Sequence, residues 1–142
     1  MSQMVEMKTG ELVGLALDWA VFCSVYPGMR PTINVIPATS VDRKPFSKPI
    51  SFPQAIYLSY SGAYDTEIDW SPSTDWNQGG PLRDQYRIDV QFDPNGKPVV
   101  MAHLSLDKLT YRAYGPTSLV AAMRCIVTSQ YGDTVQVPAE LL

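Results

Sequence analysis

Six prolines from Pro27 to Pro53 constrain the fold of this chain more than any other feature of its sequence. They stand at positions 27, 31, 37, 45, 49 and 53. Because proline fixes φ and lacks an N–H donor, this density excludes a long helix and limits strands to short or edge pieces. Residues 32–36 are predicted as one such strand. Residues 41–49 are predicted as an exposed loop, and a specific anion site at Arg43 and Lys44 is the less favoured interpretation.

Two segments outside this region have the spacing of amphipathic helices. In residues 9–25 we expect Thr9 to cap the helix and Tyr26-Pro27-Gly28 to end it. Its apolar stripe is Leu12, Leu15, Ala16, Trp19, Ala20 and Cys23. In residues 116–131, Pro116 favours the first turn and Gly132 stops the helix. Its stripe is Leu119, Ala122, Met123, Ile126, Val127 and Gln130, with Arg124 and Cys125 well off it.

The second half of the chain carries the signals of a β-meander. In residues 86–92 apolar and polar residues alternate, as in a half-buried strand. The turn Asp93-Pro94-Asn95-Gly96 and a strand at 98–104 complete a hairpin over 85–104, and 109–114 adds a third strand. Residues 55–60 and 133–137 are also predicted as strands. We therefore predict an α+β fold, a small antiparallel sheet covered by two helices, in one globular domain over 1–142 with a proline-rich insertion at about 27–53.

Composition narrows the class of protein. The chain has 142 residues, of which 45% are hydrophobic, so a disordered protein is excluded. Its net charge of -3 disfavours binding to nucleic acid. No apolar stretch is long enough for a membrane span or a secretory signal, so we expect a cytoplasmic protein. Cys23 and Cys125 are expected as reduced thiols, with one disulfide or a reactive thiol as the alternative.

The segment 71–81 is the most unusual part of the sequence. It combines hydroxyls, an acid, two amides, an indole and two glycines, which together suit a small polar ligand or a partner peptide. The candidate ligand-binding residues here are Ser73, Thr74, Asp75, Trp76, Asn77, Gln78, Gly79 and Gly80. Trp76 could stack on a ring, and the amides could hydrogen-bond to it. The equally weighted alternative is a structural loop in which Ser73 or Thr74 caps a turn and Trp76 plugs the core.

The remaining chemical candidates are weaker. Asp65, Glu67 and Asp69 would share one face of a strand and could hold a divalent cation, but a solvated acidic strand is the favoured interpretation. The single histidine, His103, has no nucleophile near it in the sequence, so a structural role is favoured. No catalytic, zinc, phosphate-binding or dinucleotide-binding pattern is present, so no catalytic residue, metal site or cofactor is predicted.

Three segments together resemble a known family. They are residues 7–21 (MKTGELVGLALDWAV), residues 71–82 (SPSTDWNQGGPL), and a third that runs from Gly115-Pro116-Thr117 through AAMRC to GDTVQVP at 132–138. In this order they resemble the NinX-like proteins of tailed bacteriophages and their prophages, whereas residues 27–69 and 83–114 depart from that pattern. The resemblance implies a small phage accessory protein of the bacterial cytoplasm and supplies no reaction. It also groups Asp18, Trp19, Thr117 and Arg124 with the 73–80 loop as one predicted polar pocket, with Arg124 as the anion contact.

The function expected from the sequence is therefore non-enzymatic binding. We expect the protein to capture a small polar ligand, for example a nucleotide-like one, or to block a host factor. The alternative is a protein–protein adaptor or inhibitor that acts through the proline-rich insertion and the aromatics Phe46, Phe52 and Tyr57. A metal-dependent hydrolase built on the three acids is a third, weaker candidate. The expected partners are a small molecule or a host protein, and the oligomeric state is open, a homodimer included.

Overall fold

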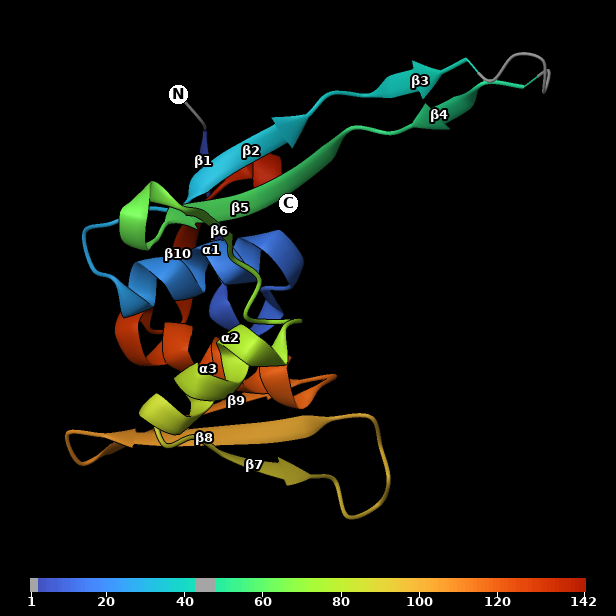
Figure 1. Cartoon of the computed structure of the whole chain (residues 1–142). Helices are drawn as coiled ribbons and strands as arrows, with labels where there is room; N and C mark the ends of the chain where they lie inside the picture. Colours follow the sequence, from blue (N-terminus) through green and yellow to red (C-terminus); the bar gives the residue numbers. More distant parts are fainter. Residues whose placement is uncertain (1–2, 43–47) are drawn as a thin grey trace.

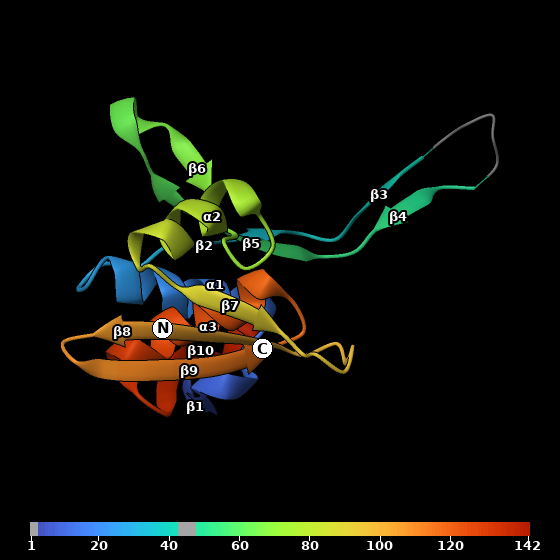
Figure 2. The same cartoon turned by 90° about the horizontal axis from the view of Figure 1, so that it is seen from below.

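Two helices pack against each other in the middle of the structure, and small antiparallel sheets lie on either side of them (Figures 1 and 2). The computed structural model describes residues 3–42 and 48–142. Helix α1 spans Gly14–Val25 and α3 spans Ser118–Tyr131. On one side α1 contacts strand β5 (Ala55–Ser61), and on the other α3 contacts β8 (Val100–Leu106) and β9 (Leu109–Gly115). This arrangement confirms the α+β class, but the helices form a central layer rather than the cover of one sheet.

Helix α1 begins later, and is buried more completely, than the sequence predicts. Thr9 does not cap it, because Thr9–Glu11 form a separate 3₁₀ turn, η1, and the helix begins after Val13. Residues Ala16–Ser24 are all buried, so the predicted stripe is only part of the buried surface. The reason is that α1 lies between α3 and β10 (Thr134–Pro138) on one side and β5 on the other.

Helix α3 is also buried on more than one face. Thr117 caps it, with its Oγ1 accepting a hydrogen bond from the Val120 N–H at 3.1 Å, and Pro116 lies outside the helix. Residues Leu119–Val127 are all buried, and this set includes Arg124 and Cys125, which the stripe placed elsewhere. The Cys125 thiol donates to the carbonyl of Ala102 and is 3.3 Å from that of Tyr111. Both cysteines are free, and burial raises the pKa of Cys125 to about 12, so it is no reactive thiolate.

The predicted meander is present as β7 (Asp89–Phe92), β8 and β9, paired in that order. The turn after β7 forms as predicted, with the Gly96 N–H bonded to the Asp93 carbonyl at 3.0 Å. Val100, Ala102 and Leu104 are buried, and His103 faces the other way. Residues 86–88 do not belong to the strand, because they follow directly on a helix, α2 (Trp76–Gln85), that the sequence does not predict.

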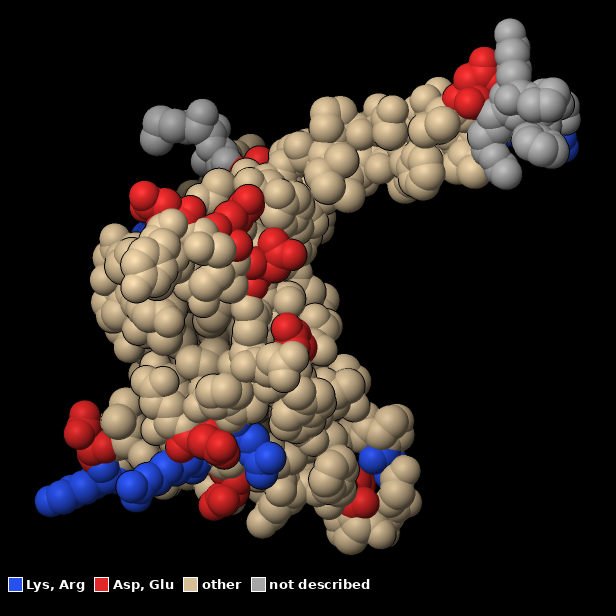
Figure 3. Space-filling model, in the orientation of Figure 1, with Lys and Arg blue, Asp and Glu red and all other residues tan. Residues whose placement is uncertain are grey.

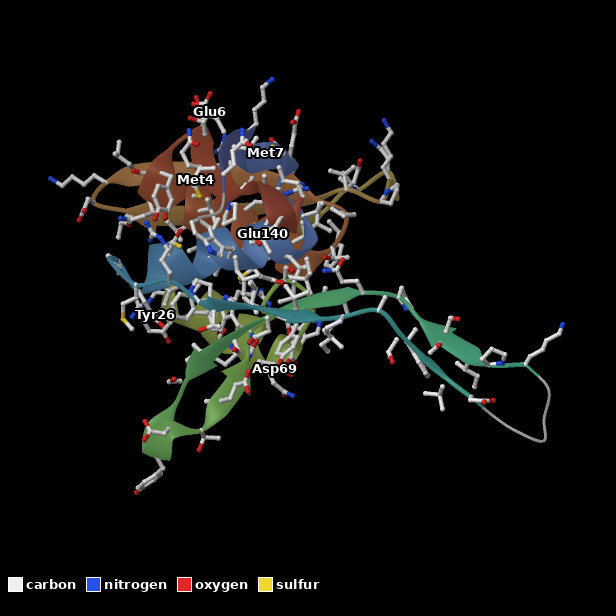
Figure 4. The ribbon with its side chains drawn as sticks, turned by 90° about the horizontal axis from the view of Figure 1, so that it is seen from above. Met4, Glu6, Met7, Tyr26, Asp69 and Glu140 are labelled. Atoms are coloured by element: carbon white, nitrogen blue, oxygen red, sulfur yellow. The ribbon has the colours of Figure 1, made fainter. Side chains whose placement is uncertain are left out.

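Strand β10 (Thr134–Pro138) was predicted, but its partner β1 (Met4–Lys8) was not. The two strands pair antiparallel over their whole length. Met7 packs against the core and Glu6 points outward (Figure 4). The sequence does not predict strand β1, because its five residues, MVEMK, are few and only weakly apolar. A final 3₁₀ turn, η3, spans Ala139–Leu141.

A third sheet contains β2 (Thr32–Ile36), β5 and β6 (Glu67–Asp69), in the order β2-β5-β6, with the 3₁₀ turn η2 (Ala63–Asp65) before β6. The predicted strand at 32–36 is confirmed. Pro37 follows β2, and Pro53 lies shortly before β5. The pairing of the two strands stops there, because proline cannot donate a ladder hydrogen bond. Beyond them the chain pairs again as β3 (Thr39–Val41) and β4 (Ile50–Phe52), which we call the arm. Arg43, Lys44 and Phe46 lie outside the described residues.

The arm projects away from the rest of the structure, and no other described element lies against it (Figures 1, 2 and 4). On the face shown in Figure 3, most Lys and Arg side chains lie over the β7–β8–β9 sheet. No helix of the described chain is long and apolar enough to cross a membrane.

Candidate functional site

The predicted loop at 71–81 is mostly a helix. Helix α2 spans Trp76–Gln85 and contains Gly79, Gly80 and Pro81, whose low helix propensity led to the loop prediction. Two local interactions outweigh that propensity. Asp75 caps the helix by accepting the Asn77 N–H at 2.9 Å, and Gly79 and Leu82 are buried against the core.

The side chains of Asp75 and Gln78 therefore hydrogen-bond to the backbone and hold this segment in place. The side-chain Oε1 of Gln78 accepts the Ser71 N–H at 2.7 Å, and its side-chain Nε2 donates to the Asp69 backbone carbonyl. These bonds tie the first turn of α2 to the end of β6. Asn77 is exposed beside them.

Gly79 allows α2 to approach the start of α3. A Cβ at this position would lie 2.3 Å from the Pro72 carbonyl oxygen and 2.6 Å from a methyl group of Leu119. At Gly80 the nearest atom would be a ring carbon of Trp76 at 3.8 Å, so that position is not crowded. Of the two glycines, only Gly79 is required by packing.

Asp18 and Ser73 come together as the resemblance implied. The Asp18 carboxylate accepts the Ser73 N–H at 2.8 Å, and its backbone carbonyl accepts the Trp70 indole N–H at 2.7 Å. Burial raises the pKa of Asp18 from 3.8 to about 6, and hydrogen bonding from Ser73 opposes that rise. The buried Ser73 hydroxyl is near this carboxylate but forms no hydrogen bond of normal geometry within the described chain. This pair fixes the segment before α2 on α1.

Four of the predicted residues surround a small hollow of about 270 Å³, which we call the Trp76 hollow: Ser73, Thr74, Trp76 and Thr117. Leu119 and Val120 complete its lining. Trp76 is 54% exposed, so the indole is not a plug of the core. The first turns of α2 and α3 meet at this hollow.

Arg124 and Trp19 do not join that hollow, and the single predicted pocket is not formed. Arg124 lies seven residues beyond Thr117, which is about 10.5 Å along a helix axis, and its guanidinium bonds to the carbonyls of Leu12 and Tyr114. Trp19 is buried, with the Arg30 guanidinium 5.2 Å from its ring centre. Adjacent residues on a helix point about 100° apart, so Asp18 reaches Ser73 while Trp19 faces another side.

The arm carries a feature that the sequence did not reveal. Thr39 pairs with Phe52 and Val41 with Ile50, so these four side chains share one face, and Ser40 with Ser51 form the other. Val41, Ile50 and Phe52 are all exposed, Phe52 to 49%. Tyr57, which we grouped with Phe52, lies in β5 instead, with its hydroxyl 3.5 Å from Glu67. Three-residue strands are too short for their alternation to be recognised in a sequence.

The acidic residues and the histidine do not gather into a metal site. Glu67 and Asp69 lie in β6, whereas Asp65 lies in η2. His103 is 3.2 Å from the carboxylate of Asp89, its partner across the strand pair. Within the described chain no three potential ligands are close enough to hold a metal ion.

Comparison with known proteins adds one match. A family model described as "Bacteriophage P22, NinX" matches residues 8–130. Of the three segments that resemble the NinX-like proteins, the match includes residues 8–21, 71–82 and 115–130. It also spans residues 27–69 and 83–114, which depart from the pattern of those segments. No curated protein matches the chain.

Proposed function

Because the chain belongs to the bacteriophage P22 NinX family and is a phage accessory protein, we propose that it acts without catalysis, by binding another protein of the infected cell through its arm. The observation that carries this proposal is the one-sided apolar face of the arm. Val41, Ile50 and Phe52 stand together on it and are exposed, while the opposite face carries Ser40 and Ser51. This function corresponds to the adaptor or inhibitor predicted for the proline-rich insertion.

The physical argument concerns what such a ribbon needs. An isolated two-stranded ribbon is marginally stable in water, and one with an apolar face gains stability when that face is covered. Each strand of the arm also has an outer edge that pairs with no described strand. Such an edge offers backbone donors and acceptors to a partner strand. Phe52 supplies the aromatic anchor that protein interfaces favour.

Substitutions on the two faces of the arm test this proposal. Phe52→Ser and Val41→Ser remove apolar side chains, and Ser40→Thr and Ser51→Thr are matched changes on the opposite face. Partners are captured from phage-infected cells with each variant and quantified by mass spectrometry. We expect Phe52→Ser and Val41→Ser each to lose a defined partner, and Ser40→Thr and Ser51→Thr each to retain it. Equal capture by all four variants would contradict the proposal.

The Trp76 hollow favours a second function, the capture of a small polar ligand such as a nucleotide. Trp76 is half-exposed there beside the hydroxyl-bearing residues Thr74 and Thr117, whereas Trp19 and Trp70 are buried. Nucleotides are therefore titrated while tryptophan fluorescence and the melting temperature are recorded. A bound nucleotide should quench the exposed indole, and at a hundred times its Kd it should add about 2.7 kcal/mol of stability. Quenching that persists in Trp76→Phe would contradict binding at this hollow.

A further inference from the structure

A groove of about 850 Å³ runs between two parts of the chain that are distant in sequence. One wall is the end of β1 and the turn η1, residues 8–11; the other is the end of β9 and the following turn, residues 112–116. Pro98 and Val99 close one part of it, and Thr128, Asp133 and Thr134 another. None of these residues belongs to the arm or to the Trp76 hollow. We call this feature the Arg124 groove.

Arg124 lies at the base of the groove and connects its walls. Its Nε donates to the Leu12 carbonyl at 2.8 Å, and its Nη1 donates to the Tyr114 carbonyl at 2.7 Å. The residue is only 8% exposed, and it still contributes to the groove lining. A guanidinium has five N–H donors in a planar fork, so two bonds to carbonyls leave donors for a ligand.

The charge of Arg124 is not neutralised by the protein around it. Among residues 3–42 and 48–142 no carboxylate lies within ion-pair distance of this guanidinium. Burial lowers its pKa from the ordinary value, which reflects the cost of keeping the charge away from water. Buried charges are usually paired, because an unpaired one is costly. An anion in the groove would supply the missing partner.

The other ionisable residues of the groove limit the charge of that anion. Lys8 and Arg112 are exposed on the two walls, and Glu11 and Asp133 are the acidic residues of the lining. With Arg124, three cations and two carboxylates leave one net positive charge. A carboxylate would balance this charge, and a phosphate ester, with about 1.5 to 2 negative charges at pH 7, would more than balance it. Pro98, Val99, Tyr114 and Pro116 add an apolar surface beside these charges.

We infer that the Arg124 groove binds a small molecule that carries one oxyanion, a carboxylate or a phosphate ester, on an apolar or aromatic skeleton. The oxyanion accepts hydrogen bonds from Arg124, and the positive charges of Lys8 and Arg112 attract it. The skeleton lies on Val99 and Tyr114. Arginine pairs with both kinds of oxyanion through two parallel N–H bonds, which makes the recognition directional.

The experiment uses two anions with their neutral counterparts. Benzoate is compared with benzamide, and phenyl phosphate with phenol, by titration into the full chain at constant ionic strength, followed by NMR. We expect at least one anion to bind more tightly than its neutral counterpart, with shifts at Val99 and Tyr114. Tighter binding by benzoate would assign a carboxylate ligand, and tighter binding by phenyl phosphate a phosphate ester. No preference for either anion would overturn the inference.

Variants separate this site from general charge attraction. Lys8→Gln with Arg112→Gln removes two exposed cations of the walls, and Lys48→Gln with Lys108→Gln removes two exposed cations elsewhere. We expect the groove pair to weaken the anion about tenfold and the control pair to change its affinity less than twofold. Arg124→Lys is a poorer test because it also breaks the bridge between the walls. Equal weakening by both pairs would mean that the anion is attracted by the overall charge of the protein and not bound in the groove, and would overturn the inference.

Discussion

The central helices and the arm use apolar side chains in opposite ways. In α3, nine consecutive residues, Leu119–Val127, are buried. In β3 and β4 all six residues are exposed, and three of them are Val41, Ile50 and Phe52. Because the hydrophobic effect scales with the area removed from water, the same residue types stabilise the fold in α3 and not in the arm. An apolar face that does little for folding is free to serve binding.

The same chemical change in the two regions should give the largest contrast. Ile126→Ala removes a fully buried side chain and should lower the free energy of unfolding by about 2–5 kcal/mol. Ile50→Ala removes a side chain that is 39% exposed, and the expected change is within about 0.5 kcal/mol. Equilibrium unfolding in urea measures both. A similar loss for the two variants would mean that the arm is part of the folded core.

A buried charge in the central region should give the next largest effect. Because the pKa of Asp18 rises from 3.8 to about 6 on folding, protonation favours the folded state. This contribution is complete below pH 3.8 and is lost as the pH rises through 6; it amounts to at most about 3 kcal/mol. Asp18→Asn keeps the oxygen that accepts from Ser73 and cannot ionise. The stability of wild type relative to this variant should therefore fall between pH 4 and pH 7, and a constant difference would contradict the raised pKa.

Packing between α2 and α3 should give a smaller effect. Gly79→Ala places a methyl group 2.3 Å from the Pro72 carbonyl oxygen, so α2 must shift, at a cost of about 1–3 kcal/mol. Gly80→Ala is the matched control, since its methyl group has space and alanine favours a helix by up to about 1 kcal/mol. Thermal unfolding compares the two variants. The close contact of α2 with α3 would be contradicted if both changes were stabilising.

Among the substitutions of predicted site residues, the one at Trp76 should give the smallest loss of stability. Trp76→Ala is expected to cost about 1 kcal/mol or less, because the indole is 54% exposed. Trp70→Ala should cost about 3–5 kcal/mol, because that indole is 4% exposed and packs on Phe22 and Tyr60. Denaturant titrations of both variants decide this. A collapse of the fold in Trp76→Ala would make Trp76 a core residue.

Long periodic segments of this fold were predictable, and short or context-dependent ones were not. Both central helices and the meander follow from patterns of six or more residues. The sequence does not predict helix α2, because its local propensity favours a loop; the Asp75 cap and the packing at Gly79 outweigh that propensity. Of the residues that the sequence groups together, Ser73, Thr74, Trp76 and Thr117 lie around one hollow, since two helix starts meet there. The resemblance groups Arg124 with the 73–80 loop as an anion contact, but a helical wheel cannot show which carbonyls its long side chain reaches.

Photo-crosslinking from the two faces of the arm tests the central claim most directly. A photoreactive phenylalanine analogue replaces Phe52 on the apolar face in one protein and Ser51 on the opposite face in another. Both are irradiated in phage-infected cells, and adducts are counted after denaturing purification. The account predicts a discrete adduct to another protein from position 52 and at most a trace from position 51. Adducts of equal yield from both positions, or from neither, would contradict it.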